Sequence, residues 1–209
     1  MDDFFATIAR RWPAGREDYH WHVLPGSELL RERLSRPYAD LLQRAGLAPV
    51  RPEYMHITIQ HLAPVSAITD AELSDIVNIA RDGCTNFAPF AVIAGRAEAW
   101  ETSVVCPLRP GYLLGELWHV VTSATRTVTG SRFAIRPAVY HPHMALAYAT
   151  GHIEQAEIRA WLADCEASEA AFPVTRLVLV AQKHDGREIT FRVVSEIPLA
   201  GEQPQIRQR

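Results

Sequence analysis

The sequence has few of the residues on which several common classes of protein depend. Only three of its 209 residues are cysteines, Cys84, Cys106 and Cys165, and no CxxC pair occurs. This spacing argues against a disulfide framework or a zinc site built on cysteine, and favours reduced thiols that pack as small apolar side chains. The sequence also has no glycine-rich phosphate loop and no GxSxG, so it gives no sign of a P-loop nucleotide-binding protein or a serine hydrolase.

An excess of positive charge and a long apolar run are also missing. With 21 basic and 24 acidic residues the formal net charge is −3, which argues against binding to long duplex nucleic acid through many phosphates. No apolar run approaches the roughly 20 residues of a membrane helix. The first residues, MDDFFATIARRW, begin acidic and do not resemble a signal peptide. We therefore expect a soluble, cytoplasmic protein without a membrane partner.

What is present is the composition of a globular protein, 48% hydrophobic and 22% charged, with regular alternation of strands and helices. Apolar periodicity and end signals predict helices over 27–46, 69–83, 112–125 and 153–165. The first of these is interrupted by Pro37, and the second starts with a capping box of Thr69 and Glu72. Strands are predicted over 20–25, 53–62, 87–100, 103–108, 139–148, 174–182 and 189–199. The Asp-Gly pair in KHDGRE, 183–188, predicts a closing hairpin.

The order of these elements repeats along the chain. Each half is predicted as strand, helix, strand with a histidine, helix and strand. From His56 to Phe87 is 31 positions (87 − 56), and from His143 to Val174 is also 31 (174 − 143). The prediction is an α+β, two-lobed fold of internally duplicated β-α-β-α-β halves, with two antiparallel sheets facing a central cleft.

The domain boundaries follow from this repeat. Residues 1–17 are an N-terminal helix or extension, and residues 18–198 form a single two-lobed domain. Its first half spans about 18–100 and its second half about 101–198, with the closing hairpin expected to extend the sheet of the second half. Residues 199–209 are a polar, flexible tail.

The two histidine strands carry the candidate chemistry. In EYMHITIQHL, 53–62, His56 and Thr58 stand two places apart, so a strand presents both on one side. In VYHPHMALAY, 139–148, His143 is the corresponding histidine. One neutral imidazole can take a proton while a second, protonated one gives a proton, and a hydroxyl can hold a non-bridging phosphate oxygen. Such a pair suits phosphodiester chemistry without a metal.

These motifs, HITI and PHMALAY in a duplicated β, α, β pattern, resemble the 2H phosphoesterase superfamily of LigT-like, or 2′-5′ RNA ligase-like, proteins, over about residues 18 to 198. The resemblance implies a phosphoesterase that hydrolyses, or reversibly forms, a phosphodiester in a small nucleotide or RNA end. Examples are a 2′,3′-cyclic phosphate and a 2′-5′ linkage. It implies His56 and His143 as catalytic residues, Thr58 as the phosphate-binding residue, and no metal or cofactor.

The second motif departs from the family pattern at one position. Ala145 stands where the family has Thr or Ser, which removes one hydrogen bond to phosphate. A charge-assisted bond of this kind contributes about 1.5–3 kcal/mol. His141, two places before His143, is a candidate to compensate, either as a phosphate ligand or, after a shift of register, as the proton donor itself. Lys183 and Arg136 are further candidates through charge alone.

Two alternatives remain open. The first is a catalytically weakened protein of the same fold that binds nucleotide or RNA ends without turnover, with Ala145 as the mark of lost chemistry. The second is a metal-dependent hydrolase on the HxH pairs, His20 with His22 and His141 with His143.

The other histidines are predicted to be structural or solvated. His61 follows His56 at an odd spacing, so regular alternation puts it on the opposite side of the strand. Three more fall in a helix, at a helix start and in a turn, and are expected to face solvent: His119, His152 and His184.

Overall fold

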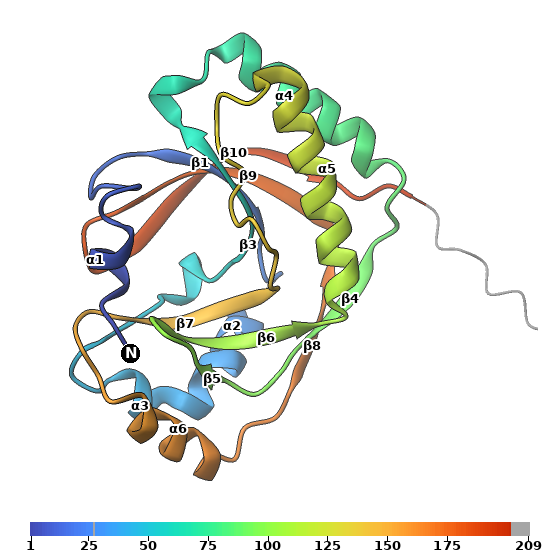
Figure 1. The fold of residues 1–209 in the computed structure, drawn as a ribbon. Coiled ribbons are helices and arrows are strands. Elements are labelled where there is room, and N and C mark those ends of the chain that lie inside the picture. Colours follow the sequence, from blue (N-terminus) through green and yellow to red (C-terminus); the bar gives the residue numbers. More distant parts are fainter. Residues whose placement is uncertain (27, 202–209) are drawn as a thin grey trace, which may run out of the picture.

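Two antiparallel sheets form the framework of the chain, and helices cover the outer side of each (Figure 1). The computed structural model describes residues 1–26 and 28–201. The predicted α+β fold with two antiparallel sheets is confirmed. Ser27, the predicted helix start, and residues 202–209 of the predicted tail lie outside the described residues.

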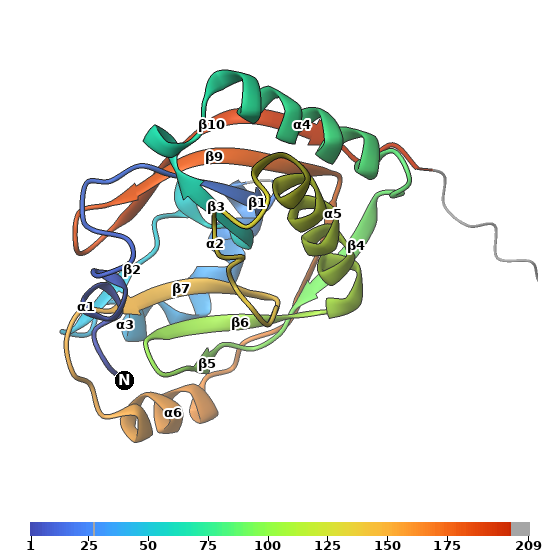
Figure 2. The ribbon, with the colours of Figure 1, turned by 45° about the horizontal axis from the view of Figure 1, so that its top comes forward.

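The first sheet has the strand order β10-β9-β1-β3. Its strands are β1 (Asp18–Val23), β3 (Ile57–Pro64), β9 (Arg176–His184) and β10 (Ile189–Pro198). Two helices pack together on its outer face: α4 (Asp70–Cys84) and α5 (Gly111–Thr129). Figure 2 shows α4 lying above β10, with α5 beside it. The predicted hairpin is present, and Gly186 adopts a φ of +96° in its turn, a conformation that favours glycine.

The second sheet has the strand order β2-β7-β6-β4-β8, with β5 paired to β6. Its strands are β2 (Leu47–Pro49), β4 (Phe90–Ala94), β5 (Glu98–Ala99), β6 (Ser103–Arg109), β7 (His143–Ala149) and β8 (Ala170–Val174). Its helices are α2 (Glu28–Ser35), α3 (Ala39–Leu42) and α6 (Gln155–Asp164). Of these, α6 lies on the side of this sheet away from the first one (Figures 1 and 2).

The lobes do not follow the two halves of the sequence, because the halves exchange strands. β4 belongs to the first half but pairs with β6 and β8 in the second sheet. The closing hairpin of β9 and β10 joins β1 in the first sheet. The expectation that this hairpin extends the sheet of the second half is therefore wrong. Strand periodicity records which residues alternate, but not which strand becomes a neighbour.

Local signals explain most element boundaries. Thr69 and Glu72 form the predicted capping box at the start of α4, with each side chain bonded to the other residue's backbone N–H. Pro37 breaks the helix predicted over 27–46 into α2, the 3-10 turn η1 (Arg36–Tyr38) and α3. At the N-terminus, Asp3 caps a short helix, α1 (Phe4–Ile8), which lies beside β7.

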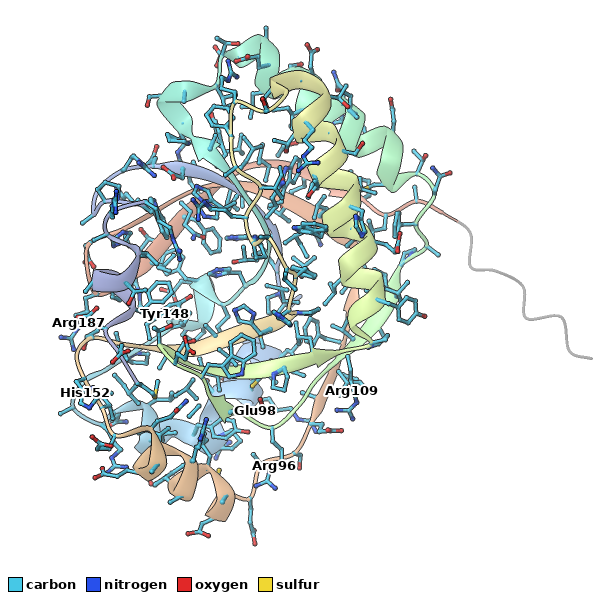
Figure 3. All side chains as sticks on the ribbon, viewed as in Figure 1. Arg96, Glu98, Arg109, Tyr148, His152 and Arg187 are labelled. Carbon is cyan, nitrogen blue, oxygen red and sulfur yellow. The ribbon has the colours of Figure 1, made fainter. Side chains whose placement is uncertain are left out.

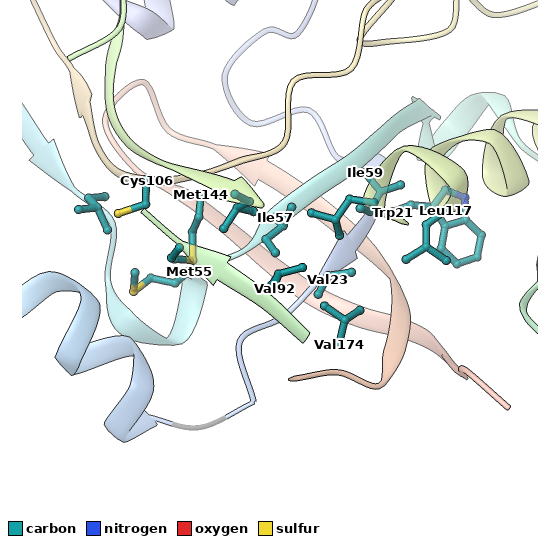
Figure 4. Close-up of a cluster of buried hydrophobic side chains, with 14 of the residues drawn as sticks. Trp21, Val23, Met55, Ile57, Ile59, Val92, Cys106, Leu117, Met144 and Val174 are labelled. Carbon is teal, nitrogen blue, oxygen red and sulfur yellow. The ribbon is translucent and has the colours of Figure 1, made fainter. Parts of the chain in front are cut away.

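The core fills the space between the first sheet and its helices and continues into the second sheet. Trp21 of β1 and Leu117 of α5 are both fully buried there (Figure 4). On the same face, the amide of Gln60 bonds Thr122 and Thr125 of α5, so a buried polar side chain is satisfied. Within the described residues, no helix is long and apolar enough to cross a membrane.

Candidate active site

A cavity of about 640 Å³ opens between the two sheets and is closed on one side by the N-terminal segment. The four site residues predicted from the sequence, His56, Thr58, His141 and His143, all line it. Arg11 and Arg136 also line it, and no Asp or Glu of the described residues does. In a chain with 24 acidic residues, a cavity wall free of carboxylates suits an anionic ligand.

The His56 ring is held by a backbone carbonyl and a stacked neighbour. The 3-10 turn η2 (Pro52–Tyr54) brings the carbonyl oxygen of Tyr54 to 2.7 Å from Nδ1, which donates a hydrogen bond to it. The ring of His22 stacks on His56, with centroids 4.1 Å apart and an interplanar angle of 14°. With Nδ1 occupied, Nε2 is the nitrogen left to exchange a proton.

His143 has the same support on the opposite sheet. It is the first residue of β7, and its Nδ1 donates to the carbonyl oxygen of His141 at 2.7 Å. Trp100 packs against its ring with a centroid separation of 4.6 Å. In both motifs, therefore, the histidine is bonded to the carbonyl two residues before it, and the same nitrogen, Nε2, is left for chemistry.

Burial favours the neutral form of both imidazoles in the unliganded protein. Burial lowers the pKa of His56 to about 4, against the hydrogen bond to Tyr54, which raises it, and together with the charge of His143, which lowers it. Burial also lowers the pKa of His143, although the hydrogen bond to the carbonyl oxygen of His141 acts to raise it. A bound phosphate would favour the protonated form of either ring, so that with a ligand present one imidazole can be protonated while the other stays neutral.

Each motif strand has a β-bulge directly after its motif. The pairing of β3 with β1 passes over Ile59, and the pairing of β7 with β6 passes over Leu146. An extra residue reverses the alternation of side chains from that point on. The residue five places after each histidine, His61 (61 − 56) and Tyr148 (148 − 143), consequently lines the cavity. Tyr148, labelled in Figure 3, lies near α1 and stacks on Phe4.

His61 was predicted to face away from His56, and the bulge makes that prediction wrong. Its Nε2 lies 2.7 Å from Oδ2 of Asp18, a fully buried carboxylate. Arg16 donates two further hydrogen bonds to Asp18, each of 2.7 Å. Burial acts to raise the pKa of Asp18, but these partners outweigh it and the pKa is lowered. A charged carboxylate thus fixes His61 in the cavity wall.

Ala145 is not among the residues that line the cavity, but it packs against residues that are. It is 8% exposed and belongs to a cluster with Ile8, Trp12 and Tyr148. Other hydroxyl groups do line the cavity near this position, among them Ser103 of β6, which pairs with Tyr148. His141 is exposed, lies just before β7 and lines the cavity. Periodicity alone could not reveal Ser103, because the register of β6 against β7 decides its position.

The other residues considered from the sequence differ in whether they line the cavity and in how far they are exposed. Lys183 is exposed and does not line the cavity, whereas Arg136 does. His119 and His152 are exposed as predicted. His184 was predicted to be solvated, but it is 2% exposed and its Nε2 bonds the carbonyl oxygen of Trp12 at 2.8 Å.

The described part of the chain contains no group of three or more His, Cys, Asp or Glu side chains arranged to hold a metal ion. The metal-hydrolase alternative needs His20, His22, His141 and His143 to act together. Instead, His20 stacks on His61 and His22 on His56. The side-chain arrangement gives that alternative no support.

The fold and this cavity define a class of protein. It is a two-lobed α+β protein in which each lobe contributes one motif histidine to a cavity suited to an anionic ligand. A family model described as LigT like Phosphoesterase matches residues 26–106, which includes His56 and Thr58 and ends before His143. A search of curated proteins finds no match to the chain.

Solved structures share the fold over nearly the whole chain. TT0787 of Thermus thermophilus is 16% identical, with a TM-score of 0.71, covering 89% of this chain and 100% of that one. E. coli LigT complexed with 3′-AMP is 17% identical, with a TM-score of 0.66, covering 88% and 98%. Kluyveromyces marxianus Usb1 with uridine monophosphate is 10% identical, with a TM-score of 0.51, covering 86% and 99%.

The family match and the shared fold agree with the resemblance carried by the two motifs. The chain is thus similar to the LigT like Phosphoesterase family over residues 26–106 and shares the fold of the solved LigT structures over nearly its whole length.

Proposed function

We propose that the protein is a metal-independent phosphoesterase acting on a phosphodiester in a small nucleotide or RNA end, such as a 2′,3′-cyclic phosphate or a 2′-5′ linkage. The observation that carries this proposal is the matched support of His56 and His143, each bonded through Nδ1 to the carbonyl two residues before it, in one cavity. Similar structures were solved with 3′-AMP, NADP+ and uridine monophosphate, which supports a nucleotide ligand.

The proposed reaction uses the two Nε2 atoms in opposite protonation states. One imidazole takes a proton from water, and the water oxygen bonds to phosphorus. The other imidazole gives its proton to the leaving oxygen as the phosphorus–oxygen bond breaks. On a 2′,3′-cyclic phosphate, cleavage of the bond to the 3′ oxygen leaves a 2′-phosphate. Burial keeps His56 neutral, which suits it to the role of base in this direction.

Thr58 is the proposed phosphate ligand, two residues after His56 on the same face. In the second motif Ala145 cannot serve, and we assign the missing contact to the hydroxyl of Ser103, with His141 as the other candidate. Tyr148 can also donate, because burial raises the pKa of its hydroxyl and keeps it protonated.

The test is product analysis with 2′,3′-cyclic mononucleotides in the presence of EDTA. Phosphorus NMR should show the cyclic phosphate replaced by one monoester, the 2′-phosphate. The His119→Ala variant, which changes an exposed histidine outside the cavity, should give the same product at the same rate. Turnover that stops on metal removal and returns on metal addition contradicts the proposal.

The second candidate is a protein of this fold that binds nucleotide or RNA ends without turnover, which the buried Ala145 favours. It predicts saturable binding of 2′-AMP with no cyclic phosphodiester hydrolysed by the wild-type protein. Binding titration and product analysis on one preparation separate the two.

A further inference from the structure

Two arginines at the cavity wall have no acidic partner. Arg11 lies in the turn after α1, and Arg136 lies in the segment 130–142 that joins α5 to β7. Over residues 1–26 and 28–201, neither guanidinium has a hydrogen bond or an ion pair. Arg132 of the same segment, by contrast, is paired with Glu72 at 2.7 Å. The missing partner is therefore a feature of the cavity wall and not of the segment.

The two guanidinium groups are close enough to affect one another. Burial lowers the pKa of Arg11, and the charge of Arg136 lowers it further. Two like charges without a counter-ion are unfavourable, and a doubly charged anion offsets both at once. Guanidinium groups match phosphate oxygens in geometry as well as in charge.

The backbone places this pair away from the motif histidines. The backbone N–H of His61 donates to the carbonyl oxygen of Arg136 at 3.0 Å, which joins segment 130–142 to the far part of β3. His61 lies five residues beyond His56, which corresponds to roughly 16 Å along a strand at about 3.3 Å per residue, or about 13 Å if the bulged residue adds no length. Trp12, next to Arg11, packs its ring 6.4 Å from the ring of His61.

Other groups in the cavity wall are suited to the neutral part of a nucleotide. Trp12 and Tyr140 provide aromatic surface, and the amide of Gln182 provides a polar group. The Oε1 atom of Gln182 is buried and has no hydrogen-bond partner among the described residues. The cavity thus has one end with the two motif histidines and a second, cationic end, with aromatic and amide groups in its wall.

We propose that Arg11 and Arg136 bind a second phosphate of the substrate, separate from the phosphate that the paired histidines process. The proposal rests on the proposed function for the identity of the first phosphate. The preferred substrate is then a nucleotide or RNA end with at least two phosphates. The second one is either the 5′-phosphate of the same nucleotide or the next phosphodiester of the chain.

Kinetics with three substrates test the proposal. They are a nucleoside 2′,3′-cyclic phosphate with a free 5′-hydroxyl, the same compound with a 5′-phosphate, and a dinucleotide that ends in the cyclic phosphate. The wild-type protein should show a KM at least about tenfold lower for one or both of the last two. Whichever substrate gains identifies the source of the second phosphate. An equal KM for all three overturns the proposal.

The variants Arg11→Gln and Arg136→Gln sharpen this test. Each should raise the KM of the favoured substrate about tenfold and leave the kinetics of the 5′-hydroxyl substrate unchanged. Arg10→Gln is the matched control, because Arg10 is exposed and does not line the cavity. If an arginine variant impairs all substrates equally, the arginines serve the reacting phosphate or the fold, and the proposal is wrong.

A binding titration separates this proposal from the proposed function, because it needs no turnover. The probes are adenosine 2′-monophosphate and adenosine 2′,5′-bisphosphate. The wild-type protein should bind the bisphosphate at least about tenfold more tightly, and the double arginine variant should bind both equally. This preference without any hydrolysis refutes the proposed function and leaves the second site intact. Hydrolysis without any preference among substrates or probes refutes the second site alone.

Discussion

His20, His22 and His56 have only 4%, 0% and 6% of their surface exposed, so a proton taken up by any of them must be buried. Burial is the largest cause of the lowered pKa of all three. In the unfolded chain their pKa values return to about 6.5. As the pH falls below about 6.5 the unfolded chain therefore takes up protons that the folded protein does not, and stability falls with it.

The size of this effect follows from the number of rings. From pH 7 to pH 5 a histidine with an unfolded pKa near 6.5 and a neutral folded state costs about 2 kcal/mol of unfolding free energy. Three such rings cost about 6 kcal/mol, which is comparable to the total stability of many domains, about 5–15 kcal/mol. Asp18 does not contribute in this range, because its pKa is lowered in the folded protein and its stabilisation is lost only below about pH 4.

Urea unfolding followed by tryptophan fluorescence at pH 7, 6 and 5 measures the effect. His22→Phe should reduce the loss between pH 7 and pH 5 by about 2 kcal/mol, since it removes one titrating ring. Neither ring nitrogen of His22 has a hydrogen-bond partner in the described structure, so phenylalanine leaves no donor or acceptor unpaired. His119→Ala, at an exposed position, should leave the loss unchanged. A stability that stays level from pH 7 to pH 5, or an unaltered loss in His22→Phe, refutes the reasoning.

Four further substitutions test the packing and the buried carboxylate of the fold. Ala145→Thr should lower the free energy of unfolding by about 1–3 kcal/mol and raise turnover less than threefold, because the side chain at position 145 is buried. A several-fold gain in rate at an unchanged melting temperature would show that the missing hydroxyl is a defect. Asp18→Asn should lower the free energy of unfolding in urea by about 3 kcal/mol, because the Arg16 guanidinium loses its buried carboxylate partner. A change below about 1 kcal/mol would contradict this. Gly83→Ala should lower the melting temperature, because the added Cβ would lie 2.7 Å from a methyl group of Val120. Gly115→Ala should raise it, because no atom lies within 4 Å of its added Cβ and alanine favours the helix. Equal changes in melting temperature in the two variants would contradict this packing.

The sequence predicts those features of the fold that depend on interactions between residues close together in the chain. The capping box at Thr69, the break at Pro37 and the turn at Gly186 all appear where the sequence predicts them. His56 directly precedes β3 and His143 is the first residue of β7, and both line the one cavity between the two sheets.

What could not be predicted depends on pairing between distant segments. The exchange of β4 and the closing hairpin between the sheets leaves no mark in the alternation of either strand. The bulges that turn His61 and Tyr148 toward the cavity depend on partners in other strands. The burial of His184 depends on Trp12, 172 positions away. Such contacts form only in the assembled fold.

The central claim is that His56 and His143 act as a pair. Its most direct test is kcat/KM for a 2′,3′-cyclic nucleotide in EDTA, measured on the wild-type protein, His56→Ala, His143→Ala and the double variant. When two groups act together in the same step, removing both lowers kcat/KM little more than removing one of them. Each single variant should lose at least about a hundredfold, and the double variant should be nearly as active as the weaker single one. A single variant within about tenfold of the wild type, or losses that multiply in the double variant, would contradict the paired mechanism.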